Sequence, residues 1–321
     1  KIPSWREIEE IWYPKHLSLE QCSSEITARY KARLFQGDSL TDLTGGFGID
    51  CSFLATGFKS ATYVERQEEL CEIAAHNFPI LNLNHINVRN EDGVAYLQTM
   101  SPVDCIFLDP ARRNEHGGKT VSIADCEPNV AELEDLLLSK ASRIMIKLSP
   151  MLDLSLALKE LKHTQEVHIL SVNNECKELL ILLGQTSPAE ITIHCVNLFT
   201  KGTQEEQHFV FTREQEQRSQ CTYTDSLGDY LYEPNASLLK AGAFRSIAAA
   251  YPVRKLHPNS HLYTSDTFIE NFPGRIFRIV NQCSFNKKEV KENLADLKKA
   301  NVTVRNFPAT VAELRKRLHL T

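Results

Sequence analysis

The sequence lacks any apolar run long enough to cross a membrane. The longest runs, such as ELLILLG at residues 178–184, are far shorter than the ~20 residues that span a bilayer. The first residues, KIPSWREIEE, contain no apolar segment of a secretory signal. These absences argue against a membrane or secreted protein, and we expect a cytoplasmic one. Because the first residue is Lys rather than Met, we also expect further sequence upstream.

Closely spaced cysteines are absent as well. The nine cysteines are widely spaced and odd in number, and none of them forms a C-x-x-C pair. This pattern argues against a disulfide framework and against a zinc knuckle, so we expect reduced thiols. His257 and His261 have half of a metal-ligand spacing, but Pro258 lies between them and no cysteine pair completes the set. We therefore expect no metal site.

Low-complexity segments and an unusual composition are also missing. With 42% hydrophobic and 24% charged residues, the chain is typical of a soluble globular enzyme. Its 321 residues exceed one average domain, so we expect more than one. The net charge of −5 does not favour binding of nucleic acid by the molecule as a whole.

From about residue 38, short β-rich runs alternate with amphipathic stretches, which indicates a parallel sheet covered by helices. Near the end of this region, EVHILSV (166–172) and ELLILLG (178–184) are joined by too few residues for a crossover helix and should be antiparallel neighbours. We therefore predict an α/β fold with a doubly wound, seven-stranded, Rossmann-like sheet over residues 38–187. A helical segment (1–37) precedes it, and a β-rich, ferredoxin-like linker module (188–240) and an α+β domain (241–321) follow it.

Three glycines stand close together in TDLTGGFGID (41–50), between the first predicted strand and the first helix. Glycines allow positive φ and close approach of a ligand, and the N-terminus of the following helix offers N–H groups. The stretch is not the dinucleotide fingerprint, because Cys51 stands where that motif needs glycine. It predicts a nucleotide-like ligand bound by Thr44, Gly45, Gly46, Phe47 and Gly48.

Acidic residues stand at the ends of three successive predicted strands. Asp42, just before the glycines, is well placed for the ammonium of a methionine moiety and badly placed for a pyrophosphate. Glu65, at the end of the second strand, can accept hydrogen bonds from both ribose hydroxyls, and Arg66 follows it in the predicted site. Asp92, after the third strand, can hold an adenine amino group. The alternative, that Asp42 and Glu65 only cap helices, is less favoured because all three acids occupy corresponding strand ends.

With these features, residues 38–187 resemble the class I methyltransferase superfamily, whose doubly wound sheet closes with an antiparallel hairpin. The resemblance implies S-adenosylmethionine as the cofactor, with Asp42, the glycines, Glu65 and Asp92 among its binding positions. More narrowly, the chain resembles a family of methyltransferases with a THUMP-like C-terminal domain. This match rests on EQCSSEITARYKA (20–32), DLTGGFGID (42–50), LDPARR (108–113), IKLSP (146–150) and YEPNASLLKAG (232–242).

The LDPARR segment follows the fourth predicted strand, where this superfamily places its catalytic loop. Asp109 is our candidate to align the methyl acceptor and to manage its proton, and it also counts among the cofactor-binding positions. Methyltransferases that act on amino nitrogens often have a motif similar to (D/N)-P-P-(Y/F) at this position, in which the aromatic residue stacks on the base. This chain has Ala111 and Arg112 instead, which argues against methylation of an amino nitrogen on a stacked base. RNA uracil methyltransferases need a thiolate near the end of the fifth strand, where this chain has Ser149, so we do not expect covalent catalysis.

Two further segments each allow a functional and a structural interpretation. Arg112, the second catalytic candidate, and the adjacent Arg113 can bind phosphate or carboxylate, or can form a salt bridge to a neighbouring acid. In ARYKARLF (28–35), Tyr30 and Lys31 either close over the cofactor or pack an N-terminal helix.

Positive charge is concentrated at the C-terminal end. Between residues 271 and 321 there are eleven Lys and Arg but only four Asp and Glu, although the whole chain is acidic. These side chains can bind an RNA backbone, or can form a solvated face that stabilises helix termini. The candidates are Lys287, Lys291 and Lys298 on one predicted helix and Arg315, Lys316 and Arg317 on the next.

The resemblance, together with the local positive charge, implies an S-adenosylmethionine-dependent methyltransferase that modifies RNA, either tRNA or rRNA. The THUMP-like C-terminal module is expected to capture the RNA. One alternative is a methyltransferase that acts on a protein or a small molecule. The other is a non-catalytic protein that binds S-adenosylmethionine or RNA.

Overall fold

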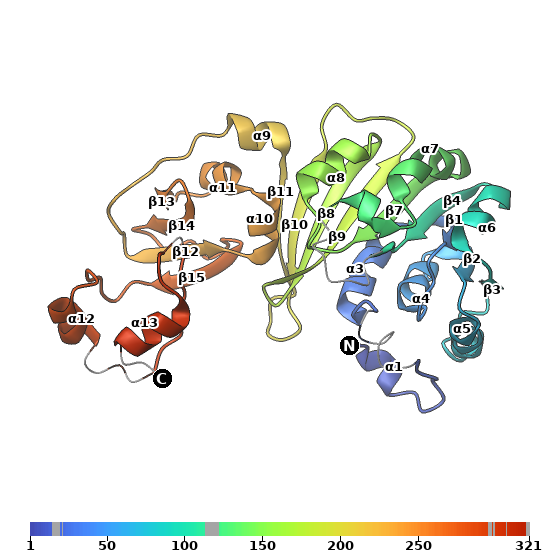
Figure 1. Cartoon of the computed structure of the whole chain (residues 1–321), viewed down its shortest axis with the longest axis horizontal. Helices are drawn as coiled ribbons and strands as arrows, with labels where there is room; N and C mark the ends of the chain where they lie inside the picture. Colours follow the sequence, from blue (N-terminus) through green and yellow to red (C-terminus); the bar gives the residue numbers. More distant parts are fainter. Residues whose placement is uncertain are drawn as a thin grey trace. The chain divides into compact units, whose positions relative to one another are not determined.

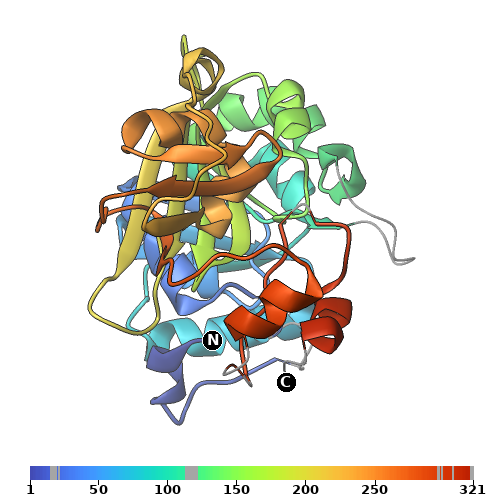
Figure 2. The same cartoon turned by 90° about the vertical axis from the view of Figure 1, so that its left-hand side faces the viewer.

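The computed structural model describes residues 1–14, 20, 22–112, 122–294, 297, 299–305 and 307–318 (Figures 1 and 2). The chain forms two compact units, Lys1–Arg213 and Glu214–Thr321, which we call the N-terminal unit and the C-terminal unit.

The N-terminal unit is built around a nine-stranded sheet with the order β11-β10-β8-β9-β7-β4-β1-β2-β3. Strands β3, β2, β1, β4 and β7 run parallel to one another. Strand β9 is antiparallel to both β7 and β8, which confirms the predicted hairpin. The strands are β1 (Gly37–Asp42), β2 (Phe58–Glu65), β3 (Ile86–Asn90), β4 (Val103–Leu108), β7 (Ala141–Leu148), β8 (Thr164–Val172), β9 (Glu175–Gly184), β10 (Thr192–Leu198) and β11 (Glu206–Thr212).

Helices cover both sides of this sheet, as the predicted α/β class requires. Figure 1 shows α3 (Glu25–Leu34), α4 (Ile49–Ala55) and α5 (Glu68–Ile80) on one side, and α7 (Val130–Lys140) and α8 (Leu154–Glu160) on the other. Helix α6 (Gly93–Thr99) packs against α7. The central strands are apolar and buried on both faces, as in other parallel sheets between helix layers.

Smaller elements complete the N-terminal unit. They are α1 (Pro3–Arg6), a 3-10 helix (Ile123–Asp125) and a two-stranded ladder of β5 (Ala111–Arg112) and β6 (Cys126–Glu127). No helix among the described residues is long and apolar enough to cross a membrane. None of the nine cysteines, all of which lie in the described part of the chain, forms a disulfide.

The hairpin of β10 and β11 belongs to the large sheet, whereas the sequence predicted it within a separate module at residues 188–240. Strand β10 pairs with β8 in a parallel ladder along its whole length, from Thr192 to Leu198. This pairing buries Ile193, Cys195 and Val196, which are at most 2% exposed. The sheet therefore has nine strands rather than the seven predicted, because the edge left open by β8 accepts two more.

The C-terminal unit contains an antiparallel four-stranded sheet with the order β13-β14-β12-β15. The rings of Tyr232, Tyr263 and Phe272 form its aromatic core, with Tyr232 and Phe272 centred 5.0 Å apart. Its strands are β12 (Tyr230–Pro234), β13 (Arg254–His257), β14 (Ser260–Ser265) and β15 (Gly274–Arg278). The helices are α9 (Arg213–Arg218), α10 (Ala236–Ala241), α11 (Phe244–Ala250), α12 (Lys287–Leu294) and α13 (Val311–Leu318).

Candidate active site

A cavity of about 470 Å³ opens at the carboxyl ends of β1, β2 and β4. Its volume is that of a site for a small ligand, for which roughly 300–1,000 Å³ is usual. Every residue predicted to bind the cofactor lines it, namely Asp42, Thr44, Gly45, Gly46, Phe47, Gly48, Glu65, Arg66, Asp92 and Asp109. The side chain of Arg112, and all of Arg113, lie outside the described part of the chain.

The glycine turn between β1 and α4 forms one wall of the cavity. Gly46 and Gly48 have φ values of +53° and +83°, which other residues rarely adopt. Gly45 is required for a different reason, because a Cβ atom there would lie 2.2 Å from the ring of Tyr63. Tyr63 is fully buried beneath the turn, and its hydroxyl donates a hydrogen bond to the Gly46 carbonyl. The turn is thus held open by backbone conformation and by one aromatic ring.

Asp42 lines the cavity and has one carboxylate oxygen without a partner among the described residues. The residue is 1% exposed, and its Oδ1 accepts a hydrogen bond of 3.0 Å from the Thr44 N–H. Its buried Oδ2 has no hydrogen-bond partner among the described residues. Burial raises the pKa of Asp42 well above its ordinary value, and the nearby carboxylates of Asp50, Asp109 and Glu65 add to the rise. A cationic hydrogen-bond donor is the ligand group that this oxygen fits.

Glu65 and Asp92 both combine a structural role with a place on the cavity wall. The carboxylate of Glu65 accepts hydrogen bonds of 2.9 Å from the N–H groups of Gly46 and Gln67, so it ties β2 to the glycine turn. Asp92 caps α6 by accepting 3.0 Å bonds from the N–H groups of Val94 and Ala95. Each carboxylate oxygen has more than one lone pair, so these bonds leave acceptor capacity toward the cavity.

Phe47 and Arg66 contribute less directly. The ring of Phe47 is 4% exposed and packs edge-on against Trp5, with centroids 5.3 Å apart, so it anchors the N-terminal segment to the turn. Arg66 is largely exposed, and its guanidinium lies 3.4 Å from the Glu127 carboxylate at the rim. Ion pairs this exposed stabilise a fold little.

Asp109 lies where the ends of β1, β4 and β7 meet. Its N–H donates a 2.6 Å hydrogen bond to Oγ1 of Thr44, which joins the end of β4 to the glycine turn. The register of β4 and β7 pairs Leu108 with Ile146, and the next two residues are Asp109 and Lys147. The Asp109 carboxylate consequently lies 2.5 Å from the ammonium of Lys147, and its side chain is 38% exposed toward the cavity.

Lys147 connects the cavity to a buried ionic network. Its Nζ lies 3.3 Å from Asp50 Oδ2 and donates a 3.0 Å bond to Ser23 Oγ. Lys31, which is fully buried, lies 2.9 Å from Asp50 Oδ1 and 2.5 Å from Glu178 Oε2. The network therefore contains two ammonium groups and the three carboxylates of Asp50, Asp109 and Glu178.

The charges of this network shift one another's pKa values. Burial acts to lower the pKa of Lys147, but the three carboxylates raise it well above its ordinary value, so the ammonium stays charged. Burial acts to raise the pKa of Asp50, yet Lys31 and Lys147 lower it to about 2. For Asp109 burial prevails and raises the pKa, against the opposing effect of Lys147.

Lys147 was not identified from the sequence as a residue of the site. For Lys31 the sequence left two roles open, closing over the cofactor or packing an N-terminal helix, and the structure agrees with the second. Lys147 could have been found from its place within the apolar run RIMIKLS of β7, because a buried ammonium needs charged or polar partners. Tyr30, which was considered together with Lys31, bonds to His168 at 2.8 Å and does not line the cavity. Neither residue closes over the site.

A covalent mechanism gains no support from the thiols. Of the described cysteines, Cys22 alone lines the cavity, and burial raises the pKa of its thiol. A nucleophilic cysteine needs a lowered pKa. Cys126 and Cys176 do not line the cavity.

Two family models match the C-terminal unit. One describes a ferredoxin-like domain and matches residues 230–273, and the other describes a THUMP-like domain and matches residues 274–321. These limits lie further along the chain than the predicted modules at 188–240 and 241–321. Among curated proteins the comparison found no match.

Solved structures provide the remaining comparison. An inferred methyltransferase from Porphyromonas gingivalis W83 is 39% identical, with a TM-score of 0.90 over 99% of this chain and 80% of that one. An rRNA methylase from Streptococcus thermophilus is 14% identical, with a TM-score of 0.35 over 50% and 93% of the two chains. An inferred methyltransferase from Streptococcus mutans, in complex with S-adenosylhomocysteine, is 12% identical, with a TM-score of 0.36 over 50% and 96%. The last two are too distant to carry an argument. From the first likeness, the chain belongs to the family of the Porphyromonas protein, methyltransferases with a THUMP-like C-terminal domain in the class I methyltransferase superfamily.

Proposed function

We propose that this methyltransferase uses S-adenosylmethionine and acts on RNA. The observation that carries the cofactor assignment is the unpaired, buried Oδ2 of Asp42 at the wall of the cavity. A buried carboxylate oxygen is costly without a partner, and a ligand ammonium supplies one. A pyrophosphate only accepts hydrogen bonds, so it cannot satisfy this oxygen.

The other predicted residues fit the remaining parts of the same ligand. Glu65, 9% exposed and fixed by two backbone N–H groups, presents its carboxylate for ribose hydroxyls. The exposed Asp92 stands at the rim for an adenine amino group. The glycine turn, with Gly46 and Gly48 in left-handed conformations, lets a ligand approach the backbone closely.

In this proposal Asp109 is the residue that faces the methyl acceptor. When bound, the cofactor supplies a methyl group on a sulfonium, which needs no activation by a protein nucleophile. The protein then has to align the acceptor and receive its proton. The Asp109 carboxylate can do both, because it is partly exposed to the cavity and is oriented by the 2.5 Å contact with Lys147.

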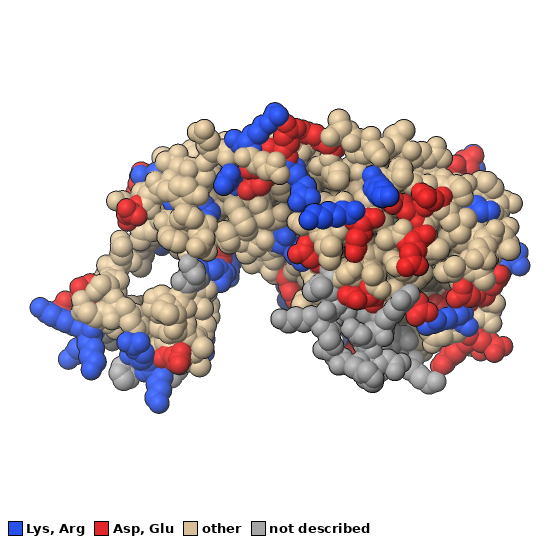
Figure 3. All heavy atoms as spheres, turned by 45° about the horizontal axis from the view of Figure 1, so that its top comes forward, with Lys and Arg blue, Asp and Glu red and all other residues tan. Residues whose placement is uncertain are grey.

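The RNA assignment rests on the C-terminal unit. Figure 3 shows Lys and Arg side chains gathered on the lobe that carries α12 and α13. Residues of α12 and α13 in this group include Lys287, Lys288, Lys291, Arg315, Lys316 and Arg317, which we call the basic cluster. Lys298, which was predicted to join it, lies outside the described residues. Clustered positive charge binds a phosphate backbone, and the THUMP-like match to the same residues agrees with this proposal.

Calorimetry tests the cofactor assignment directly. The wild-type protein should bind S-adenosylmethionine, and Glu65→Ala should weaken binding by about 1–3 kcal/mol through loss of the ribose hydrogen bonds. NAD should not compete. Absence of S-adenosylmethionine binding, or tighter binding of NAD, would refute the assignment.

Nucleoside mass spectrometry tests the substrate class. Purified tRNA and rRNA from cells with and without the gene should differ by one methylated nucleoside, and the purified protein should restore it in vitro. If both RNA pools are unchanged while the protein still binds the cofactor, a protein or small-molecule acceptor, or a binding role without turnover, replaces the RNA proposal.

A further inference from the structure

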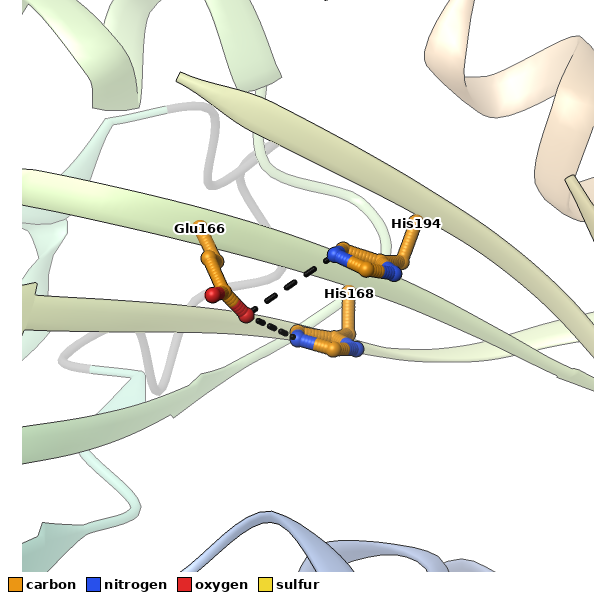
Figure 4. A group of neighbouring side chains, drawn as sticks. All are labelled: Glu166, His168 and His194. Carbon is orange, nitrogen blue, oxygen red and sulfur yellow. Dashed lines mark hydrogen bonds and ion pairs between the residues drawn. The ribbon is translucent and has the colours of Figure 1, made fainter. Parts of the chain in front are cut away.

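A second cluster of polar side chains lies on the large sheet, among residues that do not line the cavity. Glu166 and His168 alternate along β8, so both project from the same face of the sheet. The parallel register of β8 and β10 places His194 directly beside His168. Figure 4 shows both imidazole rings next to the Glu166 carboxylate. Within the described part of the chain, this is the one group of three possible metal ligands whose donor atoms converge.

The distances between the donor atoms suit one ion. Nε2 of His168 lies 3.1 Å from Oε2 of Glu166, and Nε2 of His194 lies 3.8 Å from the same oxygen. All three donor atoms are within 4.8 Å of one another. Zinc bonds of 2.0–2.2 Å place neighbouring donors of a tetrahedral site roughly 3.3 Å apart. The two measured distances bracket that value. The two rings are stacked, with centroids 4.2 Å apart and planes 6° apart, so they have to tilt toward each other to share one ion.

The Nδ1 atom of each imidazole ring, on the side away from Glu166, lies within hydrogen-bond distance of a second side chain. Nδ1 of His168 lies 2.8 Å from the hydroxyl of Tyr30, and Nδ1 of His194 lies 3.1 Å from Nε2 of His208. When each Nδ1–H donates to its partner, each Nε2 keeps a lone pair that faces Glu166. Imidazoles that bind metals are oriented in this way by a hydrogen bond from the other ring nitrogen. Tyr30 and His208 are therefore placed to orient the two rings.

We propose that Glu166, His168 and His194 bind a divalent transition-metal ion, zinc by preference. Two imidazoles and one carboxylate are a usual donor set for zinc, which accepts water as its fourth ligand. The His168 side chain is 3% exposed, whereas those of His194 and Glu166 are 19% and 46% exposed, so the ion can enter from solvent. The ion links β8 to β10, and thereby fastens the β10–β11 hairpin to the sheet.

Zinc binding by the chelator-treated full chain tests the site. Equilibrium dialysis with Zn²⁺ alone should give one tightly bound ion per chain. Glu166→Gln keeps the side-chain shape but removes the charge, and should weaken binding about tenfold or more, and His194→Ala should abolish it. His163→Ala is the matched control, because His163 lies 3.2 Å from Glu134 but belongs to no group of three possible ligands within the described residues. This control should bind zinc like the wild type.

Two further readouts separate this site from the nine thiols. Co²⁺ in place of zinc should give visible d–d bands without a thiolate charge-transfer band. Saturating zinc should raise the melting temperature of the wild type by roughly 5–10 °C at a free concentration of ~100 times Kd, but not that of His194→Ala. The proposal is overturned if the wild type binds no zinc, or if Glu166→Gln and His194→Ala both bind it as the wild type does. In that case Glu166 serves only as a hydrogen-bond partner of His168.

Discussion

At the scale of single residues, we expect Asp42 to lower the stability of the ligand-free protein, as a buried carboxylate that the proposed ligand would pair. Burial raises its pKa, so the folded protein holds the proton more tightly than the unfolded chain. The carboxylate therefore has no effect below the ordinary Asp pKa of about 4, and lowers the free energy of unfolding as the pH rises from there toward the raised pKa. Asp42→Asn should stabilise the ligand-free protein at neutral pH by about 1–2 kcal/mol, and not at pH ~3.

The same substitution should impair cofactor binding, which urea denaturation and calorimetry on one sample can separate. The exposed Asp38→Asn is the control, and should change neither quantity. Destabilisation by Asp42→Asn at neutral pH would contradict this account, and would mean that Asp42 mainly supports the turn through Thr44.

Lys147 neutralises the carboxylates of Asp109 and Asp50, and we expect the stability of the fold to depend on it. Lys147→Met leaves Asp109 without its cation and Asp50 with only Lys31, and breaking a buried ion pair on one side costs about 3–5 kcal/mol. The loss should be greatest at neutral pH and should shrink in acid, because protonation of the stranded carboxylates relieves it. Lys59→Met is the control, since its contact with Asp38 is exposed.

Acid sensitivity of the wild type follows from the same network. The pKa of Asp50 in the folded protein is lowered to about 2. Its contribution to the free energy of unfolding is therefore complete above the ordinary Asp pKa and is lost as the pH falls through about 2. This contribution amounts to about 2 kcal/mol. Denaturation curves of wild type and Lys147→Met between pH ~2 and ~7 check both statements, and parallel curves would contradict them.

At the scale of elements, the turn from β1 to α4 needs glycine for two different reasons, lack of space at Gly45 and a positive φ at Gly46. Gly45→Ala places a methyl group against the buried Tyr63 ring, at 2.2 Å, so the ring or the turn must move. Such overpacking costs about 1–3 kcal/mol. Gly46→Ala meets nothing closer than 3.9 Å and suffers only from its φ of +53°, which costs about 1 kcal/mol.

Urea denaturation of both variants, with cofactor binding measured alongside, distinguishes these causes. Gly45→Ala should lose more stability than Gly46→Ala, and should also weaken cofactor binding because Tyr63 bonds to the Gly46 carbonyl. Equal losses would show that backbone conformation, and not the Tyr63 ring, governs the turn.

At the scale of the whole molecule, charge is divided between the two units. The chain carries a net charge of −5, yet the basic cluster lies on α12 and α13. If the basic cluster binds RNA phosphates, affinity should fall as salt rises, and the slope of log affinity against log salt should decrease by about 0.7 for each phosphate that is no longer neutralised. Changing Lys291, Arg315 and Lys316 to Glu should thus reduce the slope by up to about 2 and leave cofactor binding intact.

Arg317 is left unchanged in that variant, because its guanidinium lies 4.5 Å from the ring of Phe285 and its removal would disturb packing. The control changes three exposed lysines of the N-terminal unit, Lys159, Lys177 and Lys201, to Glu. If this control lowers RNA affinity as much as the cluster variant, the effect is one of net charge and the cluster is no specific RNA surface.

The sequence by itself determined the local chemistry of the cavity. A glycine turn after the first strand, and acids at the ends of successive strands, were readable because each depends on a few neighbouring residues. Parallel strands then bring their carboxyl ends to one edge, so Asp42, Glu65 and Asp92 meet without further information.

Only the tertiary structure decided which distant groups pair. Lys31 meets Glu178 across 147 positions of the chain, and Lys147 meets Asp50 across 97, since strand order and helix placement bring them together. The place of β10 beside β8 follows from the open edge of the sheet, and that pairing sets His194 beside His168. Apolar periodicity reports that a strand is buried, but not which strand lies next to it. The buried ion pairs and the histidine cluster depend on that neighbour.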